Sequence, residues 1–224
     1  MSSVEFHKFR ENINNINDYI DQKEKIFDNF IDQGLPNKRN ESWKYFDLIS
    51  KSKKYIKNDI SNSEIIVEDL GEKNIFYDYT DNNLSIEDYF KPCNFFKSES
   101  VVDLNVACGN QIKILDIKHT QNEPITIKID HNGKNISLPR LIINIADNVK
   151  AKINYVNSTT NGFLNLLVEY NIGNKSELEI SRINSSQGLL VETNLVFLLN
   201  HSNFNMNDLK EKLDLFLPIV LVKN

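Results

Sequence analysis

The sequence predicts a mainly β protein that begins with an α-helical region. Apolar residues recur every three or four positions in residues 1–58, which is the period of an amphipathic helix. From residue 100 onward, apolar and polar residues alternate, which is the period of a β-strand. The stretches between these strands are too short to hold crossover helices. The second half is therefore expected to be β-structure without intervening helices.

The first segment, residues 1–58, is predicted to be helical. Gly34 is expected to end a long helix in a left-handed cap, and Pro36 prevents the helix from continuing. A second, shorter helix is predicted to begin near Asn40, whose side chain can cap free N–H groups, and to carry Trp43 as a packing anchor. The apolar stripe of the long helix consists of Phe6, Phe9, Ile13, Ile16, Ile20, Phe27 and Phe30.

Residues 59–99 are interpreted as a connector. A short strand is predicted at residues 65–67, and the box Ser85-x-x-Asp88 is predicted to open a one-turn helix. No clear periodicity runs through the rest of this stretch, so irregular chain is expected there.

The body is predicted to span residues 100–200. Its alternating stretches are ITIKI, AKINYV, LNLLVEYNI, ELEISRI and LLVETNLVFLL. Pattern alone permits either an antiparallel sandwich or a solenoid of stacked strands. Residues 201–224 are expected to form a divergent tail, since Met206, Leu209, Leu213 and Phe216 have the spacing of a helix face.

Composition restricts the class of protein. The 224 residues carry a net charge of −5, which favours neither DNA nor an anionic membrane as a partner. The basic run at residues 51–57 is accordingly interpreted as a solvated helix face. Neither a signal peptide nor an apolar run of about 20 residues occurs, and the two cysteines have no CxxC spacing, so a cytoplasmic protein with reduced thiols is expected.

The sequence predicts no metal site and no catalytic site. Cys93, Cys108, His119 and His131 lie too far apart in sequence for any pair to have a chelating spacing. Cys108 is expected to be a small buried residue at a strand end, and His131 to be exposed beside a tight turn. A nucleophile elbow and a phosphate-binding P-loop are both absent from the sequence.

Four stretches of the sequence carry recognisable motifs: GLPNKRNESWKYFDL at 34–48, LNVA at 104–107, EPITI at 123–127 and LPRLIINIADNVKAKINYV at 138–156. In this order they resemble the SufB/SufD family of iron–sulfur cluster assembly proteins, and SufD-like members most. The residues that carry the resemblance are Gly34, Pro36, Lys38, Arg39, Glu41, Trp43, Lys44, Tyr45, Leu48, Leu104, Asn105, Pro139 and Arg140.

The resemblance implies a right-handed parallel β-helix preceded by a helical region. It also implies a non-catalytic subunit that partners a SufB-like scaffold and a SufC-like ABC-type ATPase, with a homodimer as a further expectation. No cofactor is expected on this chain, because an iron–sulfur cluster would be held only in the assembled complex. Trp43 and Tyr45 would anchor the helical region, which is expected to close the N-terminal end of the β-helix.

Family members run longer than this sequence, through further β-helix turns and a helical region that docks the ATPase. The sequence therefore predicts a truncated or shortened member with weakened ATPase binding. Two rival interpretations remain: a carbohydrate-active β-helix and a β-sandwich interaction module. The first would use paired acids on one strand face, for which Glu177 and Glu179 are candidates.

Overall fold

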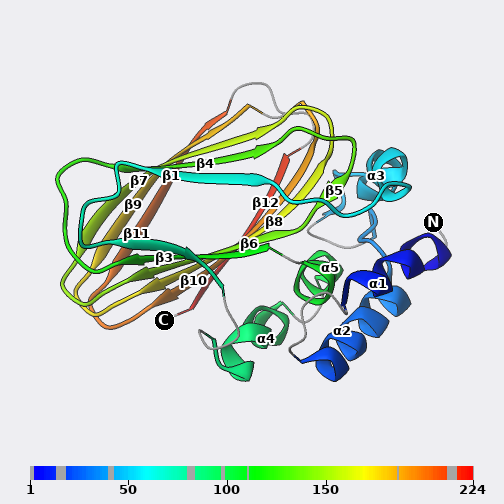
Figure 1. Cartoon of the computed structure of the whole chain (residues 1–224), viewed down its shortest axis with the longest axis horizontal. Coiled ribbons are helices and arrows are strands. Elements are labelled where there is room, and N and C mark those ends of the chain that lie inside the picture. Colours follow the sequence, from blue (N-terminus) through cyan, green and yellow to red (C-terminus); the bar gives the residue numbers. More distant parts are fainter. Residues whose placement is uncertain are drawn as a thin grey trace.

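The body is a β-solenoid in which the chain passes back and forth between two sheets (Figure 1). The computed structural model describes residues 3–13, 19–39, 43–79, 84–96, 99–109, 111–185, 187–210 and 216–223. One sheet contains β2 (Ile75–Asp78), β3 (Gln111–Ile117), β5 (Ile136–Ser137), β6 (Pro139–Ile145), β8 (Phe163–Ile172), β10 (Leu189–Leu198) and β12 (Phe216–Lys223). The other contains β1 (Glu64–Glu68), β4 (Ile125–His131), β7 (Lys150–Thr159), β9 (Glu177–Asn184) and β11 (Asn203–Lys210).

Successive coils stack through parallel strand pairing. On the five-stranded sheet, Lys150 lies beside Glu177 and Glu177 beside Asn203, so one coil takes 27 and then 26 residues. The chain completes about four such turns between β3 and β12. Parallel pairing between coils rules out the antiparallel sandwich, which was one of the two architectures that the pattern allowed.

The two sheets enclose an apolar interior. Inward positions on the first coils are filled by Ile, Leu and Val side chains such as Ile127, Leu141 and Val168, all of which are fully buried. Because side chains alternate along a strand, the outward positions face either solvent or the helices. The alternation seen in the sequence thus identifies which residues form the core of the solenoid.

The helices pack on the outward face of the seven-stranded sheet, beside the solenoid rather than at its end (Figure 1). Their apolar residues form one cluster with outward-facing Ile142, Leu167 and Leu195 of that sheet. At the N-terminal end of the solenoid, β1 and β2 pair antiparallel with β4 and β3, so two strands flank the first coil. The helices are η1 (Ser3–Phe9), α1 (Arg10–Ile13), α2 (Ile20–Gln33), α3 (Leu48–Ile56), α4 (Ile86–Phe95) and α5 (Ser100–Cys108).

Several predicted boundaries differ from the structure. The long first helix is divided into η1, α1 and α2, and the predicted stripe residue Ile16 lies outside the described residues. The second helix begins at Leu48, with Asp47 as its cap, and the predicted cap Asn40 is also outside the described part. Gly34 caps the end of α2 as predicted, with its N–H bonded to the Phe30 carbonyl. Its φ of 67° suits glycine, but its ψ of −173° lies outside the left-handed helical conformation that was expected.

Residues 59–99 and 100–108 are more regular than the pattern indicated. The strand predicted at residues 65–67 is confirmed as part of β1, and Ser85 caps α4 as predicted, although α4 has ten residues rather than one turn. The body does not begin with a strand at residue 100, because residues 100–108 form α5. Every residue of α5 is buried, so it shows no amphipathic period that could have revealed a helix.

The tail was predicted wrongly as a helix. Residues 203–210 and 216–223 form β11 and β12, which continue both sheets by one strand each. The apolar run LFLPIVLV contributes to β12, which pairs parallel with β10 along its length. In the described part of the chain, no helix is long and apolar enough to cross a membrane.

Candidate functional site

Two of the family-like stretches meet where α5 packs on the seven-stranded sheet. The side-chain amide of Asn105 donates to the backbone carbonyls of Pro139, at 3.1 Å, and Asn165, at 2.7 Å. Asn165 returns a bond of 2.7 Å to the Val101 carbonyl on α5. Leu104, beside Asn105, is fully buried. These residues fix α5 to β6 and β8, so Leu104, Asn105 and Pro139 have a structural role here.

Arg140 connects the same sheet to α4. Its Nε lies 2.5 Å from the Glu169 carboxylate, and both side chains are about 2% exposed. The two terminal nitrogens of Arg140 donate to the carbonyls of Tyr89, at 2.7 Å, and Asp88, at 3.0 Å. Because a buried charge is costly without partners, this arrangement satisfies both ions and holds the first turn of α4 against the sheet.

A third family-like stretch, at residues 34–48, divides into buried and exposed positions. Pro36 and Trp43 are buried, and the carbonyl of Gly34 accepts a bond of 2.6 Å from Ser100. Trp43 is therefore a packing anchor, as predicted. Tyr45 is not, because 92% of it is exposed to solvent. Arg39 and Lys44 are also exposed, and Glu41 lies outside the described residues.

The candidate metal ligands stay apart. Cys93 lies on α4 and Cys108 at the end of α5, and burial raises the pKa of each thiol, which favours the protonated form. His131 is buried rather than exposed as predicted, and its Nε2 lies 3.1 Å from the Asn135 carbonyl oxygen. Burial lowers the pKa of the His131 imidazole. His119 is exposed. No group of three His, Cys, Asp or Glu side chains converges within the described part of the chain.

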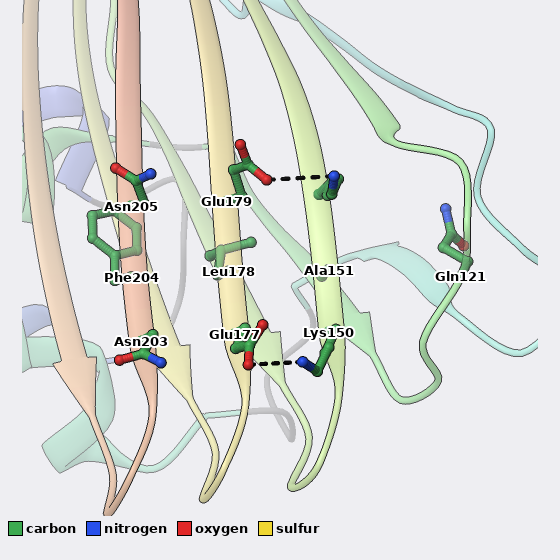
Figure 2. Close-up of a pocket in the computed structure, with 10 residues that line it drawn as sticks. Gln121, Lys150, Ala151, Glu177, Leu178, Glu179, Asn203, Phe204 and Asn205 are labelled. Atoms are coloured by element: carbon green, nitrogen blue, oxygen red, sulfur yellow. Dashed lines mark hydrogen bonds and ion pairs between the residues drawn. The ribbon is translucent and has the colours of Figure 1, made fainter.

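A groove of about 450 Å³ crosses three strands of the five-stranded sheet (Figure 2). It contains the two acids that could have served a carbohydrate-active protein. The Glu177 carboxylate lies 2.8 Å from Lys150 Nζ, and the Glu179 carboxylate lies 3.5 Å from Lys152 Nζ. Both acids are about half exposed, so the groove presents two solvated ion pairs rather than a sequestered acid pair. Its lining is Gln121, Lys150, Ala151, Lys152, Glu177, Leu178, Glu179, Asn203, Phe204 and Asn205.

A polar cluster inside the solenoid, on β7, β9 and β10, was not predicted. Arg182 on β9 points inward and pairs with Glu192 on β10, and both side chains are at most 1% exposed. The Glu192 carboxylate also accepts from Asn157 at 2.8 Å and from Asn194 at 3.0 Å. The side-chain carbonyl oxygens of these two asparagines have no partner.

A signal for this cluster exists in the sequence. In ELEISRI, Arg182 falls at the same alternate position as Leu178 and Ile180, which are both buried. A charged residue at an inward position predicts a buried partner of opposite charge. A polar cluster on β7, β9 and β10 therefore interrupts the apolar interior of the solenoid.

The C-terminal end of the solenoid presents two strand edges. In the portion of the chain described here, β11 pairs with β9 alone and β12 with β10 alone. Comparison with protein-family models, curated proteins and solved structures finds no match to this chain. The resemblance of the four stretches to the SufB/SufD family thus stays a prediction. In the structure, two of these stretches are joined by the hydrogen bond from Asn105 to the Pro139 carbonyl.

Proposed function

We propose that this protein is a non-catalytic subunit of a SufB/SufD-type iron–sulfur cluster assembly machinery in the cytoplasm. It would pair with a SufB-like scaffold and more weakly with a SufC-like ATPase, and a homodimer would use the same surface. The iron–sulfur cluster is the cargo of the assembled complex and would not be held by this chain alone. Within this proposal the solenoid winds right-handed, as parallel crossovers nearly always do, and residues 3–56 supply the family's N-terminal helical region.

The observation that carries the proposal is the pair of strand edges formed by β11 and β12. A strand edge carries a row of backbone N–H and C=O groups that can pair with another chain. In a solenoid, both sheets end at the same place, so a partner can extend both at once.

The carbohydrate-active alternative depends on the groove with Glu177 and Glu179. A glycosidase needs one acid held protonated and a second held ionised across the scissile bond. Here each acid lies beside its own lysine and is about half exposed, so the two acids do not share the sequestered site that such chemistry needs. The assembly role is therefore the better supported of the two.

Co-expression with SufB-like and SufC-like proteins tests the proposal. A tagged form of this chain is purified, and the recovered proteins and their iron content are measured. The expected result is recovery of the SufB-like protein, with less of the ATPase. Recovery of neither protein would leave the solenoid intact but remove the assembly role.

A proline scan of β11 tests whether the open edge of this strand is the contact with the partner. Proline is introduced singly at Asn205, Met206 and Asn207, and folding is checked by circular dichroism. Where the N–H points away from β9, proline leaves the fold intact but removes a donor from the open edge. Such a variant should fold and lose the partner, whereas unchanged recovery would show that the β11 edge is not the contact.

A further inference from the structure

Charge is distributed unevenly along this chain. Residues 38–57 contain seven of the 26 basic residues and two of the 31 acidic residues. This segment therefore carries a net charge of +5, and the other residues together carry −10. A local field opposite in sign to that of the remaining molecule attracts acidic groups to one place.

Several charged side chains of this segment lie around the start of α3. Lys38 Nζ lies 3.9 Å from the carboxylate of Asp47, which caps α3. Lys51 Nζ, in the first turn of α3, lies 5.4 Å from the ring centroid of Phe46, the residue after Tyr45. We name as the basic surface Lys38, Arg39, Lys44, Tyr45, Lys51 and Lys54.

Tyr45 gives this surface an exposed aromatic side chain. Its neighbours Trp43 and Phe46 are both buried, so the chain between them holds the ring outward, at 92% exposure. Lys44 Nζ lies 5.1 Å from the Tyr45 ring centroid, within the range of a cation–π interaction. A ring this exposed contributes little to folding, whereas tyrosine is enriched at the centres of protein interfaces.

Three lysines at and after α3 keep their charges available. Among the described residues, Lys53 and Lys54 of α3 and Lys57, which follows it, form no ion pair. Lys150 and Lys152, by contrast, each lie beside a glutamate on the neighbouring strand. Lys150 and Lys152 lie on strand β7, outside the basic surface, so they provide a control of equal charge.

We propose that the basic surface docks an acidic segment of another protein, with Tyr45 packing against an apolar side chain of that segment. A short acidic segment can contact the basic surface without approaching the acidic remainder of the molecule. A nucleic acid or an anionic membrane extends further and meets that remainder, whose charge of −10 repels it. This surface lies apart in sequence from the β11 and β12 edges, so it acts in addition to the proposed subunit pairing.

Fluorescence anisotropy with a labelled glutamate-rich peptide that contains one phenylalanine tests this proposal on the full chain. The variant Lys51→Gln/Lys54→Gln should weaken binding about tenfold at low salt, and Tyr45→Ala about fivefold. The control Lys150→Gln/Lys152→Gln removes the same charge outside the basic surface and should leave binding unchanged. Higher salt should weaken the wild-type affinity, because exposed charges are screened.

Three results would overturn the proposal. The first is no measurable binding of the peptide, and the second is an equal loss of binding in both lysine variants. The third is tighter binding of a single-stranded RNA oligonucleotide, or of vesicles containing phosphatidylserine, than of the peptide. None of these results depends on co-purification with a SufB-like protein. A negative result here therefore leaves the proposed function standing, and loss of the proposed function leaves this proposal standing.

Discussion

The indole N–H of Trp43 donates a hydrogen bond of 2.9 Å to the carboxylate of Glu99. This bond joins the stretch before α3 to the residue that precedes α5, across 56 positions of the sequence. Trp43 is fully buried, and its ring packs edge-on against Phe46 at 6.2 Å. The single tryptophan thus contributes both packing and a polar contact between two parts of the helical layer.

Replacement of Trp43 by alanine should lower the free energy of unfolding by about 3–5 kcal/mol, because it leaves a large cavity and an unpaired carboxylate. Chemical denaturation followed by circular dichroism measures the change. Tyr45→Ala is the control and should change stability by less than about 0.5 kcal/mol, since that ring is exposed. Similar values for the two variants would contradict the assignment of Trp43 as the anchor.

Asp103 should make stability depend on pH. Burial raises the pKa of this carboxyl to about 6, although a bond from the Cys93 thiol opposes the shift. A carboxyl with a raised pKa in the folded state is more easily protonated there than in the unfolded chain. The contribution of Asp103 to the free energy of unfolding should therefore be greatest below about pH 4 and fall by at most about 3 kcal/mol as the pH rises through 6.

The variant Asp103→Asn isolates this effect. Asparagine resembles the protonated carboxyl, so the variant should lose the fall between about pH 4 and 6 and should exceed the wild type in stability at higher pH. Unfolding curves at several pH values measure both. A parallel pH dependence in the two proteins would assign the effect to other groups.

Loss of the Arg140 side chain should strongly lower the stability of the fold. Arg140→Ala leaves Glu169 as an unpaired buried charge and should lower the free energy of unfolding by about 3–5 kcal/mol. The double variant Arg140→Met/Glu169→Leu removes both charges and should cost less than the sum of the single variants. The exposed pair of Lys150 with Glu177 is the matched control, and Lys150→Ala should cost less than about 1 kcal/mol.

Lys175 offers a stabilising substitution. It occupies a corner between β8 and β9 with a φ of 56°, a left-handed conformation that disfavours residues with a Cβ atom. Lys175→Gly should raise the free energy of unfolding by about 0.5 kcal/mol, because the relieved strain exceeds the entropy that glycine adds to the unfolded chain. The same change at Lys152, inside a strand, should be destabilising, and thermal unfolding distinguishes the two. A destabilised Lys175→Gly would show that the corner is not strained.

Inward-facing strand positions and two helix caps could be predicted from the sequence alone. The alternation at residues 125–129 and 164–172 identified inward-facing side chains that the structure buries. Local chemistry likewise predicted the caps at Gly34 and Ser85, because a cap depends on neighbouring residues alone. The burial of Arg182 could have been inferred from its place in the same alternation.

What the sequence determined by itself was the inward-facing apolar positions of the strands and the caps at Gly34 and Ser85, since both follow from residues close together in the chain. Tertiary structure decided how those segments pair. Period-2 alternation is the same in parallel and antiparallel strands, so the stacking of coils depends on contacts between residues 26–28 positions apart. The tertiary structure also decided that residues 100–108 are a helix, because a segment buried on every side has no polar face that would reveal a helical period.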